Sequence, residues 1–430
     1  MTEATTPLAE DFGPQGDDAT RARWMALVEK TLKGQSFDDA LTTETPDGVT
    51  IQPLYTARDG VAVARDLRIR DAERPWDLRV RAAHPDPTRV AKDLLTDLEG
   101  GAASVLLQLD PTGRNGVAVG SADDLAKALS GVLLDLAPVA LDAGFLGPKA
   151  ADWLGALAKA APKAPLAFHL DPLTAFMQAG ESPGPIESHV FNAATVGTRL
   201  AATYAKASLF LATGRAVHEA GGSNVEELAA MTAAALAYAK ALARSGLSTE
   251  EAFSRIVLGV SLDGEYFTGV AKIRAAKAMW ARLTEACGVS VPAKIEARSS
   301  RRMLAKADAW TNLLRLTSAG FAGAVGGADA IVLDAFTDAI GLPTAFARRQ
   351  ARNTQLVLME ESNLGRVADP AGGAWYLDSL TDQLARAAWN GFQAIEAAGG
   401  IIKALESGFI ASGVAKTRAA QEAAFADKTR

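Results

Sequence analysis

The sequence predicts an α/β fold, a (β/α)8 TIM barrel with an N-terminal arm and C-terminal helices. Eight short apolar runs alternate with longer stretches of helical character. The segments between the runs, of about 20 to 40 residues, can each hold a helix and two loops. Most runs are apolar along their length, as expected for parallel strands buried on both faces. The runs are Trp76–Ala82, Ser104–Leu109, Pro138–Asp142, Pro165–Asp171, Ala207–Thr213, Arg255–Leu262, Val291–Ala297 and Ala328–Asp334.

Helix signals lie between and after these runs. Ser223–Glu226 and Ser248–Glu251 have the pattern of capping boxes, in which the serine accepts an N–H bond and the glutamate reaches back to the cap. Thr344–Met359, which lacks glycine, and Leu380–Ile395, which has an apolar stripe, predict two further helices. An open doubly wound sheet is the alternative fold. It would need a glycine-rich phosphate turn after an early strand, and the sequence contains no such motif.

The first 60 residues differ from the rest and predict an arm that makes subunit contacts. The chain is polar up to about Asp18, and an amphipathic helix is expected at Ala22–Leu32. A small extended pair, Val49–Ile51 with Leu54–Tyr55, is expected further on. The arm either packs on another molecule or is a disordered leader. We therefore expect an arm at 1–60, a barrel at 61–397 and a helical tail or start of a linker at 398–430.

Composition excludes several classes of protein. With 49% apolar residues and a net charge of −6 over 430 residues, the chain can bury a large core and is not expected to be disordered. A single cysteine, Cys287, rules out a disulfide scaffold and suits a reducing compartment. A pI near 5.5 argues against nucleic-acid binding. No apolar run is long enough for a membrane span, and the acidic N-terminus does not resemble a signal peptide, so we expect a cytoplasmic protein.

Reacting groups in such barrels lie at the carboxyl ends of the strands, where the residues give no convincing catalytic centre. His218 lies beside a glutamate on a glycine-rich loop and could be a general base, but a solvated loop residue or a helix cap is the favoured alternative. Arg298 and Arg301 could grip a phosphate, or could belong to the exposed start of a helix. His169 and Asp171 form only a weak metal signal, because a third ligand is missing.

Several blocks, in the same order along the chain, resemble the acyl-CoA mutase barrel of the methylmalonyl-CoA mutase family. The stretch Ala345–Thr381 contains the specific sequences ARNTQ and VADPAGG. The resemblance extends from about residue 20 to the end. The other blocks are Gly48–Tyr55, Arg74–Arg79, His218–Gly221, Ile273–Trp280, Asp308–Leu314, Gly326–Gly327 and Gly341–Thr344.

The resemblance implies a barrel whose hole holds the pantetheine arm of an acyl-CoA. It also implies a separate flavodoxin-like domain that binds adenosylcobalamin through an Asp-x-His-x-x-Gly motif. That motif occurs nowhere in these 430 residues, and we expect no cobalamin-binding domain in the chain. Where catalytic members have a histidine, this chain has Ala216, and His218 stands where they have a glutamine. Asp66–Glu73, Asp171–Thr174 and Ile331–Asp334 replace further segments that meet the substrate in catalytic members.

These departures predict the small (beta) subunit of a heterodimeric, adenosylcobalamin-dependent methylmalonyl-CoA mutase, which interconverts methylmalonyl-CoA and succinyl-CoA. The chain itself is expected to be non-catalytic, to pair with a catalytic large (alpha) subunit, and not to bind the cofactor alone. Two alternatives remain. One is an active subunit for another acyl-CoA, with cobalamin on a separate small subunit. The other is a stand-alone module that binds acyl-CoA.

Overall fold

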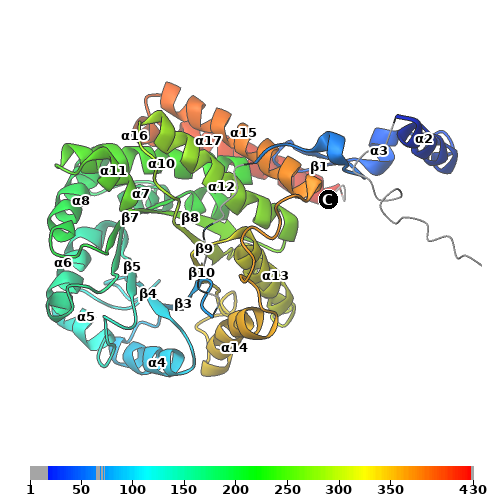
Figure 1. Cartoon of the computed structure of the whole chain (residues 1–430). Coiled ribbons are helices and arrows are strands. Elements are labelled where there is room, and N and C mark those ends of the chain that lie inside the picture. The colour runs from blue at the N-terminus through cyan, green and yellow to red at the C-terminus, as the bar shows by residue number, and fades with distance from the viewer. Residues whose placement is uncertain (1–17, 64–67, 69–70, 72, 428–430) are drawn as a thin grey trace, which may run out of the picture.

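A computed structural model describes residues 18–63, 68, 71 and 73–427. Its centre is a closed barrel of eight parallel strands, in the order β10-β3-β4-β5-β6-β7-β8-β9 around the ring (Figure 1). The predicted (β/α)8 barrel is confirmed. The strands are β3 (Asp77–Ala82), β4 (Ser104–Gln108), β5 (Val139–Asp142), β6 (Ala167–Leu170), β7 (Ser208–Thr213), β8 (Ile256–Leu262), β9 (Ile295–Ser299) and β10 (Ala330–Val332).

Seven of the eight apolar runs contain a strand, and the seventh run along the chain was placed too early. The run Val291–Ala297 overlaps β9 only in part, because β9 continues through Arg298 to Ser299. The polar side chains Glu296 and Arg298 point to one face of β9, as alternate residues of a strand do. Because these two residues are charged, an apolar pattern does not mark the carboxyl end of β9.

Helices surround the ring of strands, and the C-terminal helices pack across α10 and α12 on one side (Figure 1). A π-helical turn, η4 (Val357–Glu361), follows α14. The helices around the barrel are α4 (Pro87–Glu99), α5 (Ala122–Ala128), α6 (Gly147–Leu157), α7 (Pro172–Ala179), α8 (Ile186–Ala201), α9 (Arg215–Glu219), α10 (Asn224–Arg244), α11 (Thr249–Ser254), α12 (Tyr266–Ala286), α13 (Thr311–Gly326), α14 (Ala345–Leu356), α15 (Trp375–Ala397), α16 (Ile401–Glu406) and α17 (Phe409–Ala426).

The two serine caps differ from one another. Ser223 and Glu226 form the predicted capping box at the start of α10, with both reciprocal bonds present. Ser248 accepts from the N–H of Glu251 and so caps α11, but Glu251 does not reach back. Its carboxylate instead lies 3.9 Å from Arg255 one turn further on. The prediction of a second full capping box was therefore wrong.

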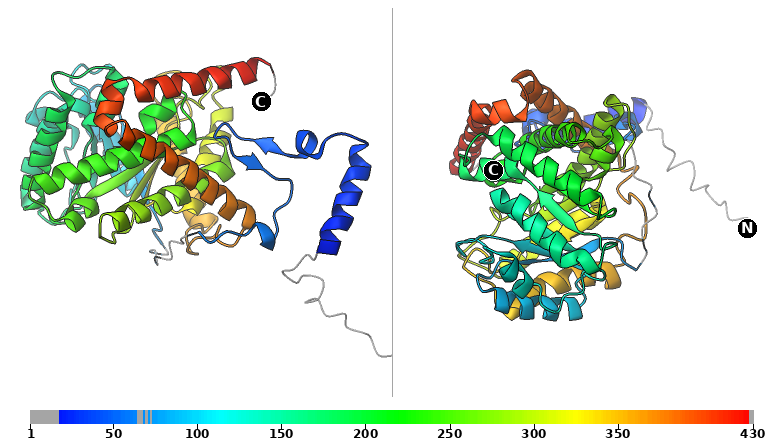
Figure 2. Two further views of the ribbon diagram at one scale, coloured as in Figure 1. Left: turned by 90° about the horizontal axis from the view of Figure 1, so that it is seen from above. Right: turned by 90° about the vertical axis from the view of Figure 1, so that its left-hand side faces the viewer.

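The arm is anchored at a hairpin and extends away from the barrel (Figure 2). Its elements are α2 (Asp18–Leu32), α3 (Phe37–Leu41), β1 (Thr43–Glu44), β2 (Thr50–Ile51) and the short turn η1 (Ala57–Asp59). The hairpin packs on the barrel through Asp47, which accepts hydrogen bonds from Asn224 Nδ2 at 2.8 Å and from the backbone N–H of Val225 at 3.0 Å. The predicted helix at Ala22–Leu32 lies within α2.

The expected pairing within the arm was wrong. Strand β2 pairs antiparallel with β1 and not with Leu54–Tyr55. The turn Asp47-Gly48 makes the hairpin, since Gly48 takes φ +71°, a left-handed conformation that glycine adopts without strain. The first part of the expected flexible segment, up to residue 17, lies outside the described residues.

Candidate ligand site at the carboxyl ends of the strands

Charged side chains from opposite strands meet on the axis of the barrel. Arg298 on β9 donates to Asp142 on β5 at 2.7 Å, and β5 and β9 are four strands apart in either direction around the ring. Arg298 Nε also donates to Glu296 at 2.6 Å, and Arg79 on β3 pairs with the same carboxylate. His169 Nδ1 on β6 lies 4.0 Å from Glu296. Because one ion pair spans the full diameter, these side chains close the barrel axis.

The paired charges stabilise one another. Burial alone would raise the pKa of Glu296, but Arg298, His169 and Arg79 hold it well below its ordinary value. Burial would lower the pKa of Arg298, but Glu296 and Asp142 raise it above its usual range. The pKa of Asp142 is lowered, because the attraction of Arg298 exceeds the effect of burial. All three groups are therefore charged at neutral pH.

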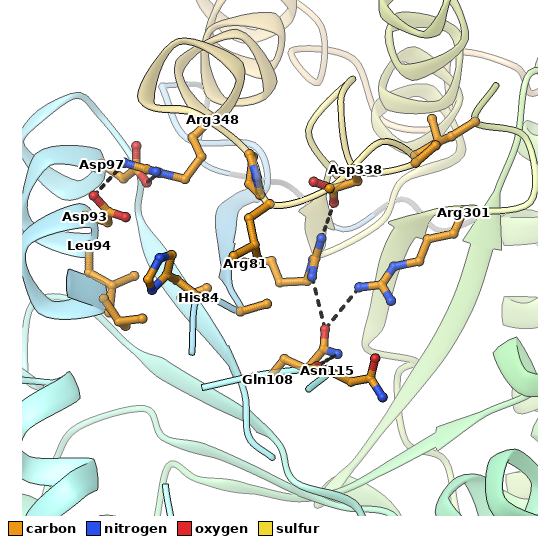
Figure 3. Close-up of a pocket in the computed structure, with 18 of the residues that line it drawn as sticks. Arg81, His84, Asp93, Leu94, Asp97, Gln108, Asn115, Arg301, Asp338 and Arg348 are labelled. Carbon is orange, nitrogen blue, oxygen red and sulfur yellow. Dashed lines mark hydrogen bonds and ion pairs between the residues drawn. The ribbon is translucent and has the colours of Figure 1, made fainter. Parts of the chain in front are cut away.

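Two cavities lie above this layer, at the carboxyl ends of the strands. We call the one on the barrel axis the axial cavity; it measures about 140 Å³. The second, the rim cavity, measures about 430 Å³ and lies toward α4 and α14. Arg81, Gln108 and Arg301 line both. Figure 3 shows Arg81 and Arg301 converging on Gln108, whose Oε1 accepts from each at 3.1 Å. These three side chains form the wall between the cavities.

Arg81 and its carboxylate partners fix that wall. Its Nε donates to Asp334 at 2.7 Å, and its Nη2 pairs with Asp338. Burial raises the pKa of Asp338 to about 6, despite the nearby Arg81. Burial would also raise the pKa of Asp334, but Arg81 and Arg301 lower it to about 2. The two carboxylates therefore differ strongly in proton affinity although they share one arginine.

The interpretation of His218 as a solvated loop residue or helix cap was wrong. Its side chain is fully buried in α9. Its Nε2 lies 2.9 Å from Ser300 Oγ, and its Nδ1 lies 3.3 Å from Glu227, which pairs with Lys272 at 2.8 Å. Burial lowers the pKa of His218 despite the nearby Glu227. Because Ser300 is also buried, this Ser-His-Glu arrangement has no access for a substrate and connects α9 and α10 to the end of β9.

The interpretation of the arginine cluster as the exposed start of a helix was also wrong. Arg298 belongs to β9 and is 4% exposed. Arg301, just beyond the strand, is half-exposed and lies 3.8 Å from Asp334. Ala216, in the first turn of α9, lies outside the lining of both cavities, whereas the neighbouring Arg215 lines the axial cavity.

His169 and Asp171 both line the axial cavity but are not part of a metal centre. Within the described residues, no three or more histidine, cysteine, aspartate or glutamate side chains gather as a metal site. Desolvation lowers the pKa of His169 to about 4, so its ring is neutral at pH 7. Burial raises the pKa of Asp171 to about 7, and Tyr238 donates to it at 2.6 Å.

The sequence contained a signal for the ion-paired axis. Asp77, Arg79 and Arg81 alternate along β3, and Glu296 and Arg298 alternate along β9. A period of two in strands that are buried on both faces places all five charges in the barrel interior. The expectation that most of the strands are apolar along their length did not include these charges.

The fold and this site define a (β/α)8 barrel with a polar site above a closed axis. A family model described as methylmalonyl-CoA mutase matches residues 72–430. The chain belongs to the methylmalonyl-CoA mutase family. Among the described residues, no helix has the length and apolar character of a membrane span.

Several relatives are similar over most of the chain. The methylmalonyl-CoA mutase small subunit of Streptomyces virginiae is 40% identical, over 95% of this chain and 68% of the relative. The small subunit of Propionibacterium freudenreichii subsp. shermanii is 34% identical, over 94% and 66%. The methylmalonyl-CoA mutase of Cereibacter sphaeroides is 30% identical, over 93% and 61%. The chain thus spans roughly two thirds of the length of these relatives.

Three of the four histidines of the chain do not fit the cobalt ligand of adenosylcobalamin, the cofactor that the family resemblance implies. His169 and His218 are buried. His84 Nδ1 accepts from the backbone N–H of Asp86, and His189 Nε2 lies 3.1 Å from the carbonyl of Pro183. A ligating imidazole needs a nitrogen that is open toward the metal and a second-shell partner on the other. His169, His218 and His84 are not placed in that way. His189, whose Nε2 can donate to the carbonyl of Pro183, meets the second condition and packs against the Phe145 ring at 4.9 Å.

Proposed function

We propose that the chain acts as the small, non-catalytic subunit of a heterodimeric methylmalonyl-CoA mutase, a complex that interconverts methylmalonyl-CoA and succinyl-CoA. One observation carries the proposal. The family resemblance implies a pantetheine arm on the barrel axis, and here the pair Arg298–Asp142 crosses that axis at 2.7 Å. A barrel closed in this way has no room for a ligand threaded along it. The small-subunit names of two of these relatives support the same role.

In this proposal the large subunit holds both the acyl-CoA and adenosylcobalamin. The cofactor supplies the radical chemistry, and residues of the catalytic chain shelter the reacting group. The lack of an Asp-x-His-x-x-Gly motif in these 430 residues supports a cofactor that is not bound by this chain alone. The complex would work in the cytoplasm.

The arm supplies the surface for the large subunit. Helix α2 contacts α3 through Trp24 and Phe37, whose ring centroids are 6.1 Å apart, and none of residues 19–32 is buried. Leu27 on the same helix is 66% exposed. An amphipathic helix that leaves its apolar face open is typical of a segment that docks on another chain. The division into an arm at 1–60, a barrel at 61–397 and a tail at 398–430 is part of this proposal.

Co-expression with a catalytic large subunit tests the association. We expect a one-to-one complex by mass photometry, and a loss of at least tenfold in affinity for the double variant Trp24→Ser, Leu27→Ser. The matched control is Leu136→Ser, since Leu136 is 72% exposed on the loop before β5. A chain that stays monomeric beside the large subunit would refute the proposal.

Titration calorimetry tests the stand-alone module, and an activity assay tests the active subunit. The proposal predicts no heat when acyl-CoA is added to this chain alone. Micromolar binding would favour the stand-alone module. Mutase activity of this chain mixed with a separate cobalamin-binding subunit, and lost in His218→Ala, would favour an active subunit.

A further inference from the structure

The axial cavity contains more unused hydrogen-bond donors than unused acceptors. Within the described structure, Arg298 Nη2 and Arg215 Nε are buried and have no hydrogen-bond partner, and the same is true of both ring nitrogens of His169. Arg298 and His169 are each 4% exposed and line the cavity. Buried polar groups are normally paired, so these atoms need an explanation.

The carboxylates of the same cavity are already engaged. Asp142 accepts from Arg298, and Asp334 accepts from Arg81. Glu219 accepts from the backbone N–H groups of two residues after β9, at 3.0 Å each. Asp171 accepts from Tyr238 Oη and from a backbone N–H of α7. Within the described residues, none of these four carboxylates makes a hydrogen bond or ion pair with Arg215. The unpaired acceptors of the lining are Thr174 Oγ1 and the unprotonated ring nitrogen of His169.

Arg215 is the arginine of this cavity that has no direct partner within the described residues. The described residues give its guanidinium no hydrogen bond or ion pair, although it lies near Asp334, Glu219 and Asp142. Desolvation, together with the like charge of Arg298, lowers its pKa to about 10. A guanidinium in this state remains charged at neutral pH and gains from a bound anion that has two oxygen atoms.

The size of the cavity limits that anion. The floor is the Arg298–Asp142 pair, and the volume is about 140 Å³. A dry protein cavity of about 150 Å³ holds a six-atom ring such as benzene. A carboxylate with a short chain fits this space. A longer tail cannot leave through the closed floor and would have to displace Arg301 at the other end of the cavity.

We propose that the axial cavity binds a small monocarboxylate, whose oxygens accept hydrogen bonds from Arg215 and Arg298. The ligand is free and short, and its binding does not depend on association with a large subunit or on cobalamin. The half-exposed Arg301, which lines both cavities, stands at the entrance.

A titration of the full chain with [1-13C]acetate, followed by the width of the carboxyl resonance, tests the proposal. We expect a dissociation constant of about 0.1–10 mM, which is reasonable for four non-hydrogen atoms. Arg215→Met should weaken binding at least tenfold, and Arg215→Lys, which keeps the charge, should restore part of it. Arg114→Met is the matched control, because Arg114 is exposed and lines only the rim cavity. The Arg114→Met variant should bind acetate with the same affinity as the unmodified chain.

Hexanoate tests the size limit, since it has the same charge and a longer tail. It should bind at least tenfold more weakly than acetate. Acetate that does not bind, acetate that binds Arg215→Met as tightly as the unmodified chain, or hexanoate that binds as tightly as acetate would each overturn the proposal. The unfolding midpoint of Arg215→Met without acetate should stay close to that of the unmodified chain, because Arg215 is only partly buried and makes no side-chain hydrogen bond or ion pair within the described residues. Folding and binding are thus measured separately.

Discussion

Replacing Arg298 with methionine should destabilise the chain by about 3 kcal/mol. Arg298 makes two charge-assisted hydrogen bonds, to Glu296 and to Asp142. Each such bond contributes about 1.5–3 kcal/mol, and removing one partner of a buried pair typically costs about 3–5 kcal/mol. The lower end applies here. Glu296 keeps its pairing with Arg79, and the Asp142 side chain is 42% exposed and can be hydrated.

Urea unfolding at pH 7, followed by tryptophan fluorescence and circular dichroism, measures the loss. Asp142→Asn keeps an acceptor and should cost only about 1 kcal/mol. The double variant should be more stable than the sum of the single losses predicts, by about 1 kcal/mol, because both changes break the same contact. The control is Arg386→Met, since Arg386 pairs with Asp382 but its side chain is 77% exposed. It should change stability by less than about 0.5 kcal/mol. A loss below about 1 kcal/mol for Arg298→Met, with no coupling to Asp142, would refute a bridge across the barrel.

Three further changes test other contacts. The folded pKa of Asp171 lies above its unfolded value, so its contribution to stability is full below about pH 4 and is lost as pH rises through 7. Asp171→Asn should remove this dependence, whose slope is at most about 1.4 kcal/mol per pH unit because a single proton is involved; pH-dependent urea unfolding measures it. His218→Ala should lower the free energy of unfolding by about 2–3 kcal/mol in the same assay, because it leaves a cavity and an unpaired Ser300. A loss below about 1 kcal/mol would contradict the buried arrangement. Gly214→Ala should lower the melting temperature strongly, because the added Cβ would lie 2.0 Å from the carbonyl oxygen of Glu227. The control is Gly120→Ala, whose Cβ would meet nothing within 4 Å and which should leave the melting temperature unchanged. Equal melting temperatures for the two variants would count against this packing.

The strands and most helices could be predicted because each depends on local pattern. A run such as Ser104–Leu109 is apolar on both faces, and the sequence around Ser223 is a local cap. The pairing within the arm was missed although Asp47-Gly48 is a local turn signal. The apolar residues Leu54–Tyr55, which follow the turn, were expected to form the second strand in place of Thr43–Glu44.

The site was less predictable, because its contacts join strands that are far apart in the chain. Arg298 and Asp142 are 156 residues apart, and their contact exists only when the ring is closed. His218 follows a strand in a glycine-rich segment, a pattern that suggests an exposed loop. The neighbouring Glu227 and Ser300, which bury it, come from other elements.

The bridge from Arg298 to Asp142 also has a consequence for the rates of folding and unfolding. Strands β5 and β9 must both be in place before the two charges can meet, so the contact forms late in folding. An interaction that is absent from the transition state slows unfolding and leaves the folding rate almost unchanged. We therefore expect the bridge to slow unfolding and to lengthen the lifetime of the closed barrel.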